Sequence, residues 1–239
     1  MTNTIRDTIN TFPLGFVFTP KDFPIDNRKQ ASVNRVLNNM VAAGQIRRLS
    51  KGRFYKPQLT ESGEVLPDIS ESIKDLIEKD GKQIGYITGH SVFNELKLTT
   101  QVSNVLQIGT TRFKKAVIRG NYQICFIKQK NAITMDNIPL LQLLDCLRFF
   151  KTIPDANPNQ ICEQLLYLLG KFDEQRKSII KSLAINYTSQ TIALLGAMLE
   201  TINSQEDTAA LLNTLNPQTS YKLGISEDVL LNQKKWNIR

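Results

Sequence analysis

The sequence holds a single histidine, His90, among its 239 residues, and it has neither a P-loop motif nor a Gly-x-Gly-x-x-Gly fingerprint. One histidine leaves no choice of Ser-His-Asp or Cys-His sets for nucleophilic catalysis. In its context Thr-Gly-His-Ser, His90 is typical of a helix start or a hydrogen-bonding residue. The pairs Asp68/Glu71 and Asp173/Glu174 are typical of helix N-terminal charges rather than an acid–base dyad. We therefore expect no enzyme and no catalytic residue.

Cysteine is scarce too. The three cysteines, Cys125, Cys146 and Cys162, lie in apolar stretches and show no Cys-x-x-Cys spacing. An odd, unclustered set argues against both a disulfide framework and a metal site. We expect buried free thiols, no metal ligand and no cofactor.

Long apolar runs are also missing. No stretch approaches the roughly 18 consecutive apolar residues of a membrane helix. The N-terminal MTNTIRDTIN is polar and lacks the apolar core of a signal peptide. With 41% hydrophobic and 22% charged residues, the composition is that of a globular protein large enough for two domains. We expect a cytoplasmic protein with no membrane partner.

Acidic residues are rare at the N-terminus. Residues 1–57 contain ten Lys or Arg, three Asp and no Glu, a net charge of +7, whereas the other 182 residues contain 20 basic and 19 acidic side chains. Nearly all of the chain's net charge of +8 therefore lies in this short segment. Such asymmetry indicates a polyanionic partner for the basic segment. A contribution to solubility is the alternative.

The same 57 residues have the pattern of a winged helix-turn-helix. Thr19 and Pro20 are typical of a helix start, Asp26 or Asn27 can cap the next helix, and Gly44 is typical of a helix end. The expected elements are helices at 2–11, 20–23 and 26–43, and strands at 45–49 and 53–56 around a turn at 50–52. Three helices followed by a hairpin indicate a DNA-binding domain over residues 1–57.

The third predicted helix has two distinct faces. Its apolar stripe follows the i, i+3, i+4, i+7 spacing of a buried face: Val33, Val36, Leu37, Met40 and Val41. At about 100° per residue, the other face is basic and amide-rich. Arg can bridge guanine, and Asn can bridge adenine, in the major groove. The candidate helix residues are Arg28, Lys29, Ser32, Arg35, Asn38 and Asn39.

Cations also surround the predicted hairpin turn, where a wing would touch the DNA backbone or minor groove. These candidates are Arg47, Arg48, Lys51 and Arg53. The expected partner of the whole basic surface is double-stranded DNA. The alternative is a protein-interaction module whose basic face meets an acidic protein.

The rest of the chain predicts a second, α+β domain. Residues 58–67 are polar, with Gly and Pro, and are expected to be a linker before a domain at 68–239. This mixed α/β domain is expected to have a small sheet within about 81–130, including a strand at 113–118, and a helical C-terminal part at about 138–215.

Two motifs resemble those of one known family. Gln45-Ile-Arg-Arg-Leu-Ser-Lys-Gly-Arg-Phe-Tyr-Lys-Pro57 is similar to the wing of AbiEi-type antitoxins of bacterial type IV toxin–antitoxin (abortive infection) systems. The stretch from Gly85 to Val102, GYITGHSVFNELKLTTQV, resembles the second-domain signature of that family. The chain departs from the signature at Val92-Phe93, where smaller residues are more usual.

The resemblance implies two roles. The N-terminal domain would repress its own operon by binding promoter repeats, and the second domain would counter a nucleotidyltransferase-like toxin without forming a stable complex with it. An orphan regulator without a toxin partner is the alternative. A third hypothesis places a ligand or enzymatic site within residues 81–200, around His90.

Overall fold

The structure is a computed structural model, and it describes residues 2–26, 29–61 and 63–239. The chain forms two compact units. The first comprises Met1–Leu76 and Val117–Gln123, and the second Ile77–Ala116 and Ile124–Arg239. Over the described residues the secondary structure is mixed, with nine α-helices and several small sheets. This agrees with the α+β class expected from the sequence.

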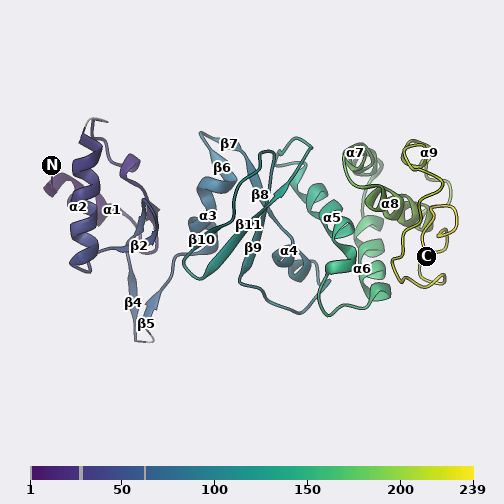
Figure 1. Cartoon of the computed structure of the whole chain (residues 1–239), viewed down its shortest axis with the longest axis horizontal. Coiled ribbons are helices and arrows are strands. Elements are labelled where there is room, and N and C mark those ends of the chain that lie inside the picture. The colour runs from purple at the N-terminus through teal and green to yellow at the C-terminus, as the bar shows by residue number, and fades with distance from the viewer. Residues whose placement is uncertain (1, 27–28, 62) are drawn as a thin grey trace. The chain divides into compact units, whose positions relative to one another are not determined.

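The first unit opens with short elements that follow the order expected from the sequence. They are α1 (Thr2–Thr11), β1 (Val17–Phe18), the 3-10 helix η1 (Pro20–Asp22), α2 (Gln30–Ala42), β2 (Arg47–Ser50) and β3 (Arg53–Tyr55) (Figure 1). The three strands form an antiparallel sheet in the order β1-β3-β2. The strand β1 was not expected, because two residues carry no periodic signal.

The predicted helix ends of this unit are largely confirmed. Thr19 and Asp22 form a reciprocal capping box around η1, but this helix is a single 3-10 turn because Pro24 follows it closely. Gly44, just after α2, has the positive φ of a helix-ending glycine, +72°. The start of α2 is later than predicted: its first helical residue is Gln30 and Lys29 is at the N-cap position, so Asp26 is not the N-cap of this helix. Asn27, one of the two predicted caps, lies outside the described residues.

The core of the first unit joins the apolar stripe of α2 to a group of phenylalanines. Val33 and Leu37 are fully buried, and Met40 nearly so, which confirms the predicted inner face. Phe18 of β1 stacks on Phe54 of β3 with ring centroids 6.2 Å apart. Burial of such side chains is worth about 1.5–3 kcal/mol each, and it fixes which side of α2 faces outward.

Residues 58–67, expected to be a linker, contain a second hairpin. Its strands are β4 (Gln58–Thr60) and β5 (Gly63–Val65), which pair in antiparallel fashion (Figure 1). The pattern did not predict strands because their residues are exposed and do not alternate between buried and polar. Helix α3 (Ile69–Ile77) follows, and its residues up to Leu76 belong to the first unit.

The second unit begins with strands and one short helix. In chain order these elements are β6 (Glu78–Lys79), β7 (Lys82–Gln83), β8 (Gly85–Thr88), α4 (His90–Glu95) and β9 (Val105–Thr110). Strand β10 (Val117–Arg119) belongs to the first unit, and β11 (Tyr122–Lys128) belongs to the second from Ile124 onward. The main sheet has the order β10-β11-β9-β8. The strand expected at 113–118 is wrong for residues 113–116: Phe113, which suggested it, is 83% exposed.

Helices complete the second unit. They are α5 (Ile138–Arg148), the 3-10 helix η3 (Phe150–Thr152), α6 (Pro158–Gly170), α7 (Glu174–Ala184), α8 (Ser189–Ile202) and α9 (Ala209–Leu212) (Figure 1). Helix α8 packs against α5, α6, α7 and α9, and every residue from Thr191 to Glu200 is buried. A helix that is apolar all round is expected at the centre of a core. No helix built from the described residues is long and apolar enough to cross a lipid bilayer.

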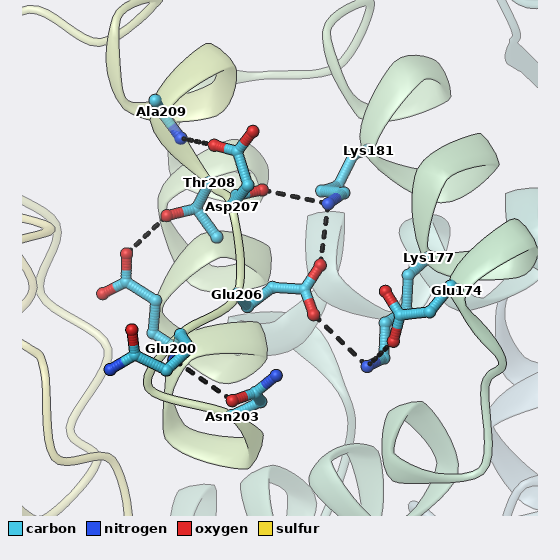
Figure 2. A network of polar contacts seen from close by, with 10 residues as sticks. Glu174, Lys177, Lys181, Glu200, Asn203, Glu206, Asp207, Thr208 and Ala209 are labelled. Atoms are coloured by element: carbon cyan, nitrogen blue, oxygen red, sulfur yellow. Dashed lines mark hydrogen bonds and ion pairs between the residues drawn. The ribbon is translucent and has the colours of Figure 1, made fainter.

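Buried ion pairs and hydrogen bonds attach the α8–α9 loop to α7 and the C-terminal segment to α8. Glu206 accepts bonds from Lys177 at 3.2 Å and Lys181 at 2.7 Å, both on α7, as Figure 2 shows. Glu200 of α8 accepts a bond from the indole N–H of Trp236 at 3.1 Å. The contacts of Glu200 with Lys235 and Trp236 fix the C-terminal segment, which has no regular secondary structure after α9.

The three cysteines are free. Cys146 and Cys162 are buried, as predicted, and Cys125 is half-buried.

Candidate nucleic-acid interface

The outer face of α2 is polar and open. Lys29, Ser32, Arg35, Asn38 and Asn39 are all exposed. Over the described residues, no carboxylate lies within ion-pair distance of Lys29 or Arg35. Their charges are therefore free to meet an external anion. Arg28, the first residue of the predicted face, lies outside the described residues.

One contact joins this helix face to the β2–β3 hairpin. The guanidinium of Arg48, on β2, donates a hydrogen bond of 2.6 Å to the side-chain oxygen of Asn38 on α2. The same guanidinium lies 5.1 Å from the centroid of the Phe54 ring. Both residues of the pair remain exposed. This contact joins the outer face of α2 to β2. We call the exposed candidates of the helix and the hairpin together the α2–hairpin surface: Lys29, Ser32, Arg35, Asn38, Asn39, Arg48 and Lys51.

Two hairpin cations have partners within the first unit. Arg47 forms an ion pair with Glu64 of β5 at 2.9 Å and also donates to the carbonyl of Gly44. Arg53 forms an ion pair with Asp75 of α3. Both arginines are half-buried. Their charges are therefore partly neutralised, and the hairpin offers fewer available cations than its sequence indicates.

The carboxylates that hold these arginines are themselves stabilised as anions. The Tyr55 hydroxyl donates to Glu64 at 2.6 Å, and this bond, with help from Arg47, lowers the pKa of Glu64. Burial and the neighbouring Glu64 raise the pKa of Tyr55 to about 12. Tyr55 thus stays a donor at neutral pH, and Glu64 stays charged.

Asp75 stands between two arginines. Burial alone would raise its pKa, but hydrogen bonds from Arg119 and Arg53 outweigh burial and lower it. Arg119, only 4% exposed, donates to both oxygens of Asp75 and to the carbonyl of Ser72. Sequence reasoning missed this pair because Asp75 and Arg119 are 44 residues apart, and no local pattern links them.

These acidic residues change the charge of the folded unit. The first unit, residues 1–76 and 117–123, contains twelve Lys or Arg and eight Asp or Glu, a net charge of +4. The segment 1–57 alone carries +7. The added residues bring five acidic and two basic side chains, and two of the acids, Glu64 and Asp75, pair with arginines of the β2–β3 hairpin. Among the candidate cations of the described residues, Lys29, Arg35 and Lys51 therefore keep their charges unpaired, whereas Arg47 and Arg53 do not.

Lys51 occupies that turn. It is exposed, and the next residue, Gly52, has the positive φ of +72° that the predicted turn requires. Lys56, by contrast, donates to the carbonyls of Asn10 and Phe12 at 3.0 and 3.2 Å. Lys51 is available to an external phosphate, whereas Lys56 holds the end of α1.

The lone histidine has a local structural role. His90 is the first residue of α4, and its backbone N–H donates to the side chain of Gln107 at 3.3 Å. Its ring meets Phe93 edge-on with centroids 5.8 Å apart. Within the described ranges, no three His, Cys, Asp or Glu side chains gather as a metal site requires.

Comparison with known proteins gives a family and a fold. Residues 4–176 match the model of a family of unknown function, DUF6088, and because the match covers well over half of the chain, the chain belongs to that family. No curated protein matches the sequence. Among solved structures, the RV2827C protein from Mycobacterium tuberculosis is similar, with a TM-score of 0.57 and 10% sequence identity. The alignment covers 92% of this chain and 83% of that one. At this identity the likeness concerns the fold alone.

Proposed function

We propose that this member of the DUF6088 family is a transcriptional regulator whose first unit is a winged helix-turn-helix that binds double-stranded DNA. In this proposal α2 is the recognition helix and the β2–β3 hairpin is the wing. The chain binds promoter DNA and performs no catalytic step. The observation that carries the proposal is the α2–hairpin surface, which combines exposed Arg, Lys, Asn and Ser side chains on one face.

The order of elements supports this assignment. A winged helix-turn-helix places its recognition helix immediately before a hairpin, and here α2 is followed by β2 and β3. The small strand β1 pairs with β3, so that the hairpin is attached to the helical part through a three-stranded sheet. The buried stripe of α2 turns its polar face outward.

The chemistry of that face supports it further. Arg35 can donate two hydrogen bonds to a guanine edge, and Asn39 can pair with an adenine edge. Lys51 and Lys29 lie where phosphate contacts would supply the salt-dependent part of the affinity. Arg48 is held by Asn38, which pre-orients its guanidinium for a phosphate or a base.

A gel-shift titration with the promoter of the protein's own operon tests the proposal. Replacing Arg35 with Ala is expected to weaken specific binding by about 1–3 kcal/mol, because one base-reading contact is lost. Arg47→Ala is the matched control, since Arg47 already pairs with Glu64. We expect a loss below about 0.5 kcal/mol for it.

Two results would overturn the proposal. One is equal binding of wild type and Arg35→Ala to promoter DNA. The other is the absence of any salt-dependent binding to random duplex DNA, which would favour a basic face that meets an acidic protein.

The antitoxin role is the narrower part of the proposal, and it rests on the resemblance of residues 45–57 and 85–102 to AbiEi-type proteins. The expected partner is a nucleotidyltransferase-like toxin that acts without a stable complex. Co-expression with the adjacent reading frame tests it: the chain should restore growth if that frame encodes such a toxin. Arg35→Ala should still restore growth, because toxin neutralisation is assigned to the second unit. If the adjacent reading frame is unrelated to nucleotidyltransferases, the protein is instead an orphan regulator without a toxin partner.

A further inference from the structure

The second unit contains a small pocket with a basic lining. Its volume is about 270 Å³, slightly below the roughly 300–1,000 Å³ of pockets that hold drug-sized ligands. The residues around it are Lys128, Gln129, Lys130, Arg148, Asn186, Tyr187 and Thr188. Three of them carry a positive charge and none is acidic, so the pocket favours a small anion.

The three cations are available. Over the described residues, no carboxylate lies within ion-pair distance of Lys128, Lys130 or Arg148. Arg148 is half-buried, and it is held at the pocket by a 3.4 Å bond to the carbonyl of Lys128 and by the Phe149 ring, 5.2 Å away. A held guanidinium loses less entropy when it binds an oxyanion in a bidentate way.

The neutral polar groups of the pocket are already satisfied. The Gln129 side chain, 4% exposed, donates to the hydroxyls of Tyr86 and Tyr187 at 2.9 and 2.7 Å, and it accepts from the backbone N–H of Asn131. The Asn186 amide donates to Asn131 at 2.7 Å. These amides are therefore held in place by bonds within the protein, and recognition of a ligand would depend on the charged side chains.

The two tyrosines that accept hydrogen bonds from Gln129 also bond to a buried carboxylate, that of Asp145. Tyr86 and Tyr187 donate to opposite oxygens of Asp145 at 2.7 and 3.1 Å, and Thr88 donates at 2.8 Å. Asp145 is fully buried and does not line the pocket. Burial raises the pKa of Asp145 despite these hydrogen bonds and the nearby Arg148, so its charged form is disfavoured.

The N-terminus of α8 adds to the positive electrostatic field in the pocket. Thr188 is the N-cap of α8, a helix of 14 residues, and its side chain accepts a bond from the N–H of Thr191. The N-terminus of such a helix carries about half a positive charge. The charge of the lining and the helix dipole therefore have the same sign.

From these contacts we propose that the pocket binds the phosphate group of a small molecule, with Lys128, Lys130 and Arg148 as its ligands. A phosphate offers three acceptor oxygens and nearly two negative charges at neutral pH, which match the three cations that line this pocket. The pocket's concave form and small volume favour a free phosphorylated compound over the backbone of DNA. This site lies in the second unit and is independent of the proposed DNA-binding function.

Isothermal titration calorimetry of the full chain with inorganic pyrophosphate tests the site. We expect saturable one-to-one binding that weakens with salt. Lys128→Ala and Arg148→Ala should each lower the affinity by about tenfold, because each removes one charge-assisted contact. Lys222→Ala removes an exposed lysine that does not line the pocket and should leave the affinity within about twofold. Thermal unfolding of each variant checks folding, and Lys130→Ala, at an exposed position, replaces Arg148→Ala if the latter is unstable.

The proposal would be overturned by pyrophosphate binding that does not saturate, or by an equal loss in Lys222→Ala, which would indicate diffuse charge attraction. A short random DNA duplex provides the second arm. If Lys128→Ala weakens duplex binding while pyrophosphate does not bind, the cations contact a DNA backbone instead. Arg35→Ala should leave pyrophosphate binding unchanged, so failure of this site and failure of the DNA-binding proposal are distinguishable.

Discussion

The α2–hairpin surface and the surroundings of α8 use charged side chains in opposite ways. On the α2–hairpin surface of the first unit, Lys29, Arg35 and Lys51 are exposed and have no carboxylate partner among the described residues. Around α8 in the second unit, Glu200 and Glu206 are nearly fully buried and each meets at least one lysine. Exposed, unpaired charges contribute little to folding but remain available to a ligand.

Buried, paired charges do the reverse. A carboxylate removed from water must be compensated by cations and hydrogen bonds, so its partners become fixed in position. In the second unit the partners of Glu206 lie on α7, as Figure 2 shows, and those of Glu200 include Lys235 and Trp236 of the C-terminal segment. Substitutions of the unpaired cations on the α2–hairpin surface should therefore change DNA affinity and leave stability intact, and substitutions of the paired charges around α8 should do the opposite.

The largest expected effect is on Glu206. Glu206→Ala would leave Lys177, whose side chain is 10% exposed, without its buried partner, and we expect a loss of about 3 kcal/mol in the free energy of unfolding. Glu174→Ala is the matched control, because Glu174 also pairs with Lys177 but is 81% exposed. Its loss should stay below about 0.5 kcal/mol. Urea unfolding measures the loss in both variants. Equal losses would contradict the stabilising role assigned to the buried Glu206.

Packing around α8 gives the next effect. A Cβ at Gly196 would overlap the indole ring of Trp236, whereas a Cβ at Gly170 would meet open space. Gly196→Ala should therefore destabilise the protein by about 1–3 kcal/mol. Gly170→Ala, at the end of α6, should be neutral or stabilise by up to about 1 kcal/mol. Thermal unfolding distinguishes them, and DNA affinity should not change in either variant at temperatures where it is folded.

A smaller effect is expected in the salt dependence of DNA binding. Lys51→Ala should reduce the slope of log affinity against log salt by about one, since one phosphate contact is lost. Arg53→Ala should reduce it by less, because Arg53 already pairs with Asp75. Fluorescence anisotropy over a salt series measures the slopes. Identical changes in the two variants would show that the pairing with Asp75 does not persist in the complex.

The smallest effect concerns pH. Burial alone would raise the pKa values of Glu200 and Glu206, but lysine hydrogen bonds outweigh burial and lower both below the ordinary value of 4.5. A lowered folded-state pKa stabilises the protein above the unfolded pKa, and this contribution is lost as pH falls through the folded-state value. The unfolding midpoint should therefore decrease below about pH 4.5. Glu206→Gln should flatten that decrease, and an unchanged acid profile would argue against the contribution.

Much of the fold was predictable because its elements carry local signals. The Val33–Leu37–Met40 stripe predicted the buried face of α2, and Gly44 and Gly52 marked a helix end and a turn. The elements that were missed have no such signal. The β4–β5 hairpin is exposed on every residue described in its strands, and the C-terminal segment is ordered by Trp236 and Glu200 rather than by any repeat of its own.

The sequence by itself determined that the N-terminal segment is basic and that one face of α2 is polar, because a 3.6-residue period and a charge count need no knowledge of distant residues. Only the tertiary structure decided which cations stay available. Arg47 and Arg53 meet Glu64 and Asp75, 17 and 22 residues further along the chain, and such pairs depend on how β5 and α3 pack. Charge is a property of the sequence, but its availability to a partner is a property of the packing.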